Sequence, residues 1–165
     1  MALLWDREVQ NAVARWGPAY GVKIPAAVVH AILEKETVHG RDPRYLKAGG
    51  AIREPDGDYS YGPMMVKGDT ARSELGISDP TTLRFPAAGI NAGVHYLAIL
   101  LARFKGNLAR AVTAYNGSGP AARVYAGKVL IVAKQYAGVV VPVAAILAFV
   151  ALLFLMPRHR ASASR

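Results

Sequence analysis

One stretch of the chain fits poorly inside the core of a small domain, because residues 137–156 form a run of twenty without a charged side chain. As a helix this run would span about 30 Å, the thickness of the hydrocarbon core of a bilayer. Basic and aromatic residues flank it as interfacial anchors do: Lys134, Tyr136, Arg158, His159 and Arg160. We therefore expect a folded domain over residues 1–136, a single transmembrane helix over 137–156 and a short basic tail over 157–165.

The charge of the chain is distributed unevenly. The formal net charge is +9, yet every aspartate and glutamate lies at or before Asp79. Such an asymmetry is typical of contact with an anionic polymer or with a membrane surface. The basic residues are scattered singly and form no run, so we expect bacterial cell wall or anionic lipid as the partner and no nucleic acid.

The hydrophobic periodicity before the apolar run predicts a mainly α-helical domain with one long loop. The expected helices cover residues 5–16, 25–37, 69–75, 86–104, 108–115 and 121–135. Gly17 and Pro18 should end the first of them, while Asp69 and Asn107 should cap the helices that they open. The chain has no cysteine, which excludes disulfides and thiolate chemistry.

The expected loop covers residues 38–60, where glycines, prolines and charges follow no period. Two short extended pieces are expected inside it, around 51–52 and 59–61, and they would form a small β-hairpin. The later long helix should place Ile90, Val94, Leu97 and Leu101 in the core, because their spacing puts them on one face.

The second expected helix carries the residue of greatest chemical interest. Val28, Ile32 and Glu36 lie four residues apart, so a carboxylate ends an apolar stripe. Partial desolvation there would raise the pKa of Glu36 and suit a general acid. Taken alone, the helix favours a plainer interpretation, in which Glu36 turns to solvent or pairs with Lys35 or Arg41.

Four motifs then occur in order along the chain. They are AILEKET at 31–37, SYGPMMV at 60–66, NAGVHYL at 91–97 and AYNGSG at 114–119. Together they resemble the catalytic domain of lytic transglycosylases of the soluble Slt type, which have a lysozyme-like fold related to goose-type lysozyme. The resemblance covers residues 24 to 130, and it reverses the plainer interpretation of the glutamate in the first motif.

The resemblance implies an enzyme that cleaves peptidoglycan glycan strands with one catalytic carboxyl, Glu36. In such enzymes one glutamic acid protonates the leaving oxygen and then takes the proton of the C6 hydroxyl, which closes a 1,6-anhydro ring on N-acetylmuramic acid. The implied substrate-binding residues are Thr37, Ser60, Met64, Met65, Tyr115, Asn116 and Tyr125. Considered singly, the two methionines could equally fill the core. We expect neither a metal nor a cofactor, because the four histidines are not spaced as ligands.

Two positions depart from the family's pattern and keep other functions open. Met65 stands where the family has a groove-lining glutamine, and Pro63 stands where it has leucine. One alternative is a goose-type muramidase, in which Asp56 and Asp58 position a water. The other is a catalytically inactive, membrane-anchored protein that binds peptidoglycan.

The expected activity and the expected membrane segment together indicate where the protein acts. The first residues do not resemble a signal peptide, because Asp6 and Glu8 interrupt them. Cations lie on both sides of 137–156, so the positive-inside rule does not fix the orientation. We expect a single-pass protein of a bacteriophage virion membrane, beside other virion membrane proteins, that opens the cell wall locally during infection. Otherwise we expect it in the bacterial inner membrane, facing the wall.

Overall fold

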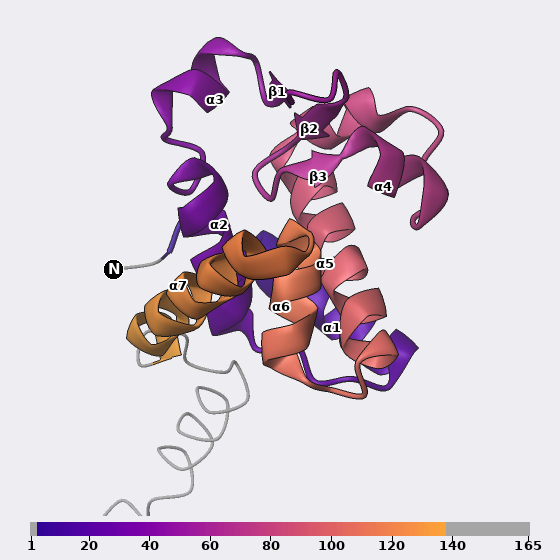
Figure 1. Ribbon diagram of the computed structural model, residues 1–165, viewed down its shortest axis with the longest axis vertical. Coiled ribbons are helices and arrows are strands. Elements are labelled where there is room, and N and C mark those ends of the chain that lie inside the picture. The colour runs from indigo at the N-terminus through magenta and orange to yellow at the C-terminus, as the bar shows by residue number, and fades with distance from the viewer. Residues whose placement is uncertain (1–2, 138–165) are drawn as a thin grey trace, which may run out of the picture.

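The computed structural model describes residues 3–137 and divides them into a helical part and a part built around a small sheet (Figure 1). The helical part comprises α1 (Asp6–Tyr20), α2 (Ala26–Thr37), α5 (Pro86–Arg103), α6 (Leu108–Asn116) and α7 (Gly119–Ala137). The sheet part comprises α3 (Pro43–Lys47), β1 (Ala51–Arg53), β2 (Tyr59–Tyr61), β3 (Val66–Lys67), α4 (Gly68–Ser73) and the 3-10 helix η1 (Pro80–Arg84). This architecture fits the expected mainly α-helical, lysozyme-like domain.

The expected membrane segment falls, apart from Ala137, outside the described residues, as does the basic tail. Between residues 3 and 137, no helix combines the length and the apolar composition that a membrane crossing needs.

The main core lies between two helix pairs, since α2 packs against α7 and α1 packs against α5. From α5 the residues expected on the core side are Ile90, Val94, Leu97 and Leu101, and none of them is more than 1 % exposed. The prediction for this helix is therefore confirmed. Burial of such aliphatic side chains contributes about 1.5–3 kcal/mol each to folding.

The sheet is antiparallel, with β2 in the middle. Ile52 pairs with Ser60 between β1 and β2, and Tyr61 pairs with Val66 between β2 and β3. The two extended pieces expected within the loop are therefore confirmed. Helix α3, which was not predicted, begins at a proline that follows Asp42, whose side chain accepts a hydrogen bond from a backbone N–H at 2.7 Å.

Two predicted boundaries are wrong. Helix α1 continues past Gly17 and Pro18 to Tyr20, because a proline in the last turn removes only one helical hydrogen bond. The helix ends instead at Gly21, which has a left-handed φ of 61°.

The second error concerns Asp69, which does not cap α4. The N-cap position belongs to Lys67, and Asp69 lies in the first turn, where it pairs with Arg72 at 2.7 Å. The carboxylate of Asp58 takes the role expected of Asp69, because it accepts the backbone N–H of Asp69 at 2.9 Å. The predicted cap of α6 is confirmed, since Asn107 accepts a backbone hydrogen bond at 3.0 Å.

Candidate active site

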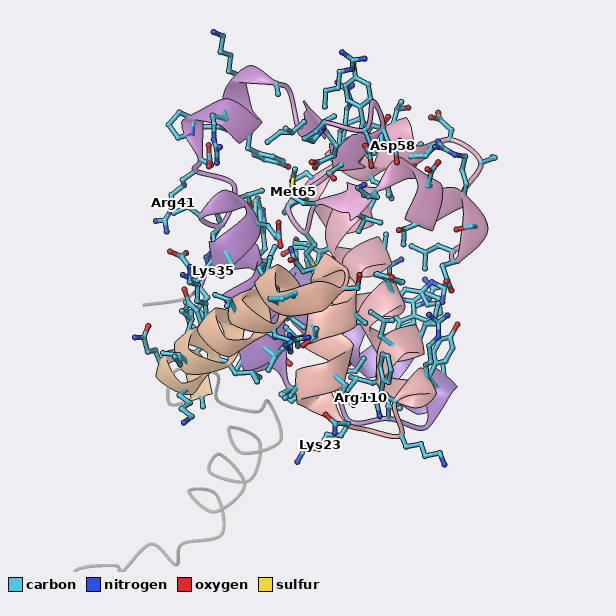
Figure 2. The ribbon with its side chains drawn as sticks, in the orientation of Figure 1. Lys23, Lys35, Arg41, Asp58, Met65 and Arg110 are labelled. Carbon is cyan, nitrogen blue, oxygen red and sulfur yellow. The ribbon has the colours of Figure 1, made fainter. Side chains whose placement is uncertain are left out.

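A cavity of about 330 Å³ lies where the helical part meets the sheet part. The helices line it with Glu36, Tyr96, Ala114, Tyr115, Asn116 and Gly117. The sheet part lines it with Glu54, Ser60, Met65, Val66, Lys67 and Thr70. Figure 2 shows Met65 at the junction between the two parts. Residues from all four sequence motifs thus meet around one space.

Glu36 lies in the last turn of α2 and is half-buried at the cavity. Burial raises the pKa of Glu36 to about 7, because the charged form loses hydration. A hydrogen bond from Tyr125 lowers this pKa, and the charge of Glu54 raises it. At neutral pH the carboxyl therefore populates both its protonated and its ionised form. Lys35 and Arg41 extend from the outer side of the molecule, and the structure described shows no ion pair between either of them and Glu36 (Figure 2).

Two tyrosines support the cavity wall beside the carboxyl. The hydroxyl of Tyr125 donates a hydrogen bond to Oε1 of Glu36. The hydroxyl of Tyr115 donates one to the carbonyl oxygen of Met64 at 2.9 Å, and its ring packs against that of Tyr96. Burial and the nearby Glu36 raise the pKa of both hydrogen-bonded tyrosines, so they act as donors.

The family model of the transglycosylase SLT domain matches residues 23–129 of the chain. The chain belongs to this family. It is a lytic transglycosylase, a lysozyme-like enzyme that acts on peptidoglycan. Comparison with curated proteins and with solved structures returns no match.

In this transglycosylase Thr37 connects α2 to the turn that carries Met65. Its hydroxyl donates to the carbonyl oxygen of Pro63 at 3.0 Å and accepts the backbone N–H of Gly40 at 3.0 Å. Thr37 is fully buried and lies outside the cavity lining. Thr37 therefore does not contact the substrate as expected. Its hydroxyl already bonds two backbone groups, so the residue positions the turn that carries Met65.

Met64 is also corrected, since it is fully buried in the main core. It packs against Gly93 of α5, where a Cβ would lie only 2.6 Å from the methionine sulfur. Met65 is turned the other way, into the cavity, and has a left-handed φ of 49°. The turn begins at Gly62, where φ is 72° and a Cβ would lie 2.2 Å from the carbonyl oxygen of Leu83.

The remaining expected residues lie as follows. Ser60 lines the cavity from β2, and Tyr115 and Asn116 line it from α6. Tyr125 does not belong to the lining and reaches the site through its bond to Glu36. The structure thus brings these four residues together around the cavity. Thr37 and Met64 are buried and do not line it.

Glu54, the second carboxylate of the cavity, was not predicted from the sequence. It follows β1, and its place opposite α2 depends on the register of the hairpin, which the sequence does not specify. The two acids expected there are engaged elsewhere: Asp56 pairs with Lys67, and Asp58 accepts hydrogen bonds at the start of α4. Lys67, Thr70 and Tyr96 were missed as well, although Tyr96 belongs to the third motif.

Proposed function

We propose that Glu36 is the catalytic acid and base with which this transglycosylase cleaves the β-1,4 bond between N-acetylmuramic acid and N-acetylglucosamine. The observation that carries this proposal is the half-buried Glu36 at the cavity, with a pKa of about 7. The protonated carboxyl gives its proton to the glycosidic oxygen. The resulting carboxylate then accepts the proton of the C6 hydroxyl, whose oxygen closes the 1,6-anhydro ring. A pKa near neutrality suits a group that must perform both steps.

The neighbours of Glu36 have separate roles in this proposal. Tyr125 holds Oε1, which leaves the other carboxyl oxygen free to exchange the proton with the sugar. Ser60, Met65 and Asn116 contact the glycan, since they line the cavity. Met65 offers an apolar surface where the family's glutamine would offer an amide, so the sugar there loses a polar partner.

A goose-type muramidase is the second candidate, and Glu54 is the observation that favours it. Hydrolysis with inversion uses two carboxyls on either side of the scissile bond, one of which activates a water. Glu54 lines the same cavity as Glu36 from the opposite part of the molecule. In this candidate Glu54 takes the part that the sequence suggested for Asp56 and Asp58.

Two matched substitutions on α2 test the catalytic assignment. Glu36→Gln keeps the shape of the side chain and removes the transferable proton, so the full chain in detergent should no longer clear purified peptidoglycan. Glu34→Gln should retain clearing, because Glu34 lies outside the cavity and pairs with His39 at 2.9 Å. Loss of clearing in Glu34→Gln alone would contradict the assignment.

For the location, we propose that residues 137–156 anchor the enzyme in the membrane of a bacteriophage virion and that it opens the wall locally during infection. The supporting features are the twenty uncharged residues and their basic flanks. A virion would deliver the domain to a wall that lies outside the cytoplasmic membrane. The other setting is the bacterial inner membrane, with the domain facing the wall.

Alkaline carbonate extraction of membranes that contain the full chain tests the anchor. We expect the protein to stay with the membranes, and Leu147→Arg to weaken this retention, because a central arginine costs about 2.5–3.5 kcal/mol on insertion scales. Release of the unsubstituted chain into the supernatant would reject the anchor.

A further inference from the structure

Helix α7 has an inner face that packs against the domain beside the active site and an outer face that is exposed. Ala126, Val129 and Ala133 are buried on the inner face, and Tyr125 reaches Glu36 from its edge. On the outer face, Val124 is 58 % exposed and Ile131 is 63 % exposed. These two residues are seven positions apart, which is about two helical turns, so they share one side.

The charged residues that border this apolar pair on α7 are all cations. Helical spacing places Lys128 along one edge, and Arg123 and Lys134 along the other. All three side chains are exposed, and the ion pairs found in the described part of the chain do not involve them. The sequences of α6 and α7 contain no aspartate or glutamate. An apolar centre with cations on both sides is typical of helices that lie in a membrane interface.

We propose that the outer face of α7, formed by Arg123, Val124, Lys128, Ile131 and Lys134, lies on the surface of a bilayer that contains anionic lipid. Charge complementarity selects this partner, because lysine and arginine are attracted to anionic headgroups. The course of the chain supports it too, since the uncharged run 137–156 follows α7 directly. The proposal rests on the proposed anchor, which keeps α7 close to the bilayer.

The contact has a consequence for the substrate. Helix α7 would then lie between the bilayer and Glu36, because Tyr125 binds Glu36 from the side of α7 that faces the domain. The cavity would stay at a fixed, short distance from the membrane. The enzyme would therefore cleave glycan strands close to the membrane surface and leave the outer layers of the wall intact.

A pair of single-cysteine variants of the full chain tests the contact, since the natural sequence has no cysteine. Ile131→Cys carries an environment-sensitive fluorophore on the outer face of α7. Leu46→Cys on α3 is the matched control, because Leu46 is 62 % exposed and belongs to the sheet part (Figure 1). In vesicles of phosphatidylcholine with phosphatidylglycerol, we expect lipid-borne quenchers to reach only the Ile131 label and aqueous iodide to reach only the Leu46 label.

Charge variants test the role of the cations. Each cation at an anionic surface strengthens binding roughly fivefold, so Lys128→Gln with Lys134→Gln should weaken the contact by about twenty-five-fold. Lys47→Gln with Arg53→Gln removes two exposed cations from the sheet part and should leave the contact unchanged.

Three results would overturn the proposal. Equal access of iodide to both labels in anionic vesicles would show that α7 stays in water. Shielding that depends on protein concentration in neutral micelles would assign the face to a second copy of the chain. Shielding that is unchanged by Lys128→Gln with Lys134→Gln would exclude an electrostatic contact. Peptidoglycan cleavage by the labelled chains reports separately on the proposed activity, and carbonate extraction reports separately on the anchor.

Discussion

The phenol hydroxyl of Tyr125 donates a hydrogen bond to a carboxyl oxygen of Glu36, across 89 positions of the sequence. The two residues meet because α7 packs along α2. The bond stabilises the carboxylate, while burial of Glu36 favours the neutral acid. The pKa of Glu36 therefore reflects a balance: burial and the charge of Glu54 raise it, and the hydrogen bond from Tyr125 lowers it.

Tyr125→Phe should disturb this balance in a defined direction. It removes the donor and keeps the ring, so the pKa of Glu36 should rise and the alkaline limb of kcat/KM should move to higher pH. Loss of orientation should also lower kcat by roughly tenfold or more. Tyr20→Phe, at a tyrosine that pairs with His95, is the control and should change neither quantity. An unchanged pH profile in Tyr125→Phe would show that the bond does not tune the acid.

Glu54→Gln should shift the same profile the opposite way. The charge of Glu54 raises the pKa of Glu36, so its removal lowers that pKa. The acid is then ionised at lower pH, and the alkaline limb of kcat/KM should move to lower pH while activity persists. Glu8→Gln removes a carboxylate from α1 and should leave the profile in place. Complete loss of activity in Glu54→Gln would instead favour the muramidase.

Met65→Gln and Met64→Gln place the same amide in two different environments. At position 65 the amide enters the cavity, and we expect KM for glycan fragments to fall severalfold with little change in stability. At position 64 it enters the main core, where an amide without a partner costs about 1–3 kcal/mol. Urea unfolding and steady-state kinetics of both variants separate the effects. Equal loss of stability in the two would contradict the placement of Met65.

Thr37→Val and Thr37→Ser test the link between α2 and the Met65 turn. Valine keeps the shape and leaves the carbonyl of Pro63 and the N–H of Gly40 without their partner, at a cost of about 1–3 kcal/mol. Serine keeps both hydrogen bonds and should cost less. We expect urea midpoints in the order threonine, serine, valine, and a lower kcat in the valine variant. A valine variant as stable as the serine variant would contradict the role of the hydroxyl.

The parts of the fold that the sequence predicts well are those with a local cause. The α5 stripe follows from the spacing of apolar residues, and Asn107 caps α6 through its own neighbouring backbone. The end of α1 was predicted wrongly because Pro18 weakens a helix only locally, while packing against α5 extends it. Propensity is a weak guide wherever tertiary contacts decide the outcome.

The lining of the cavity was predicted only at positions that lie in a motif. Glu36, Ser60 and Asn116 came from motifs and line the cavity. Which of two adjacent methionines faces the cavity depends on the left-handed φ of Met65, and no periodicity encodes that angle. The place of Glu54 depends on a hairpin register, which is a relation between strands and cannot be seen in either strand alone.

The mass of the released muropeptides tests the central claim most directly. Peptidoglycan digested by the full chain in water enriched in heavy oxygen should yield 1,6-anhydro-muramic ends, lighter by one water than reducing ends and free of the label. Glu36→Gln should yield neither product. Reducing ends that carry heavy oxygen would show that water attacks the sugar, and they would contradict the account in which Glu36 acts as the only acid and base.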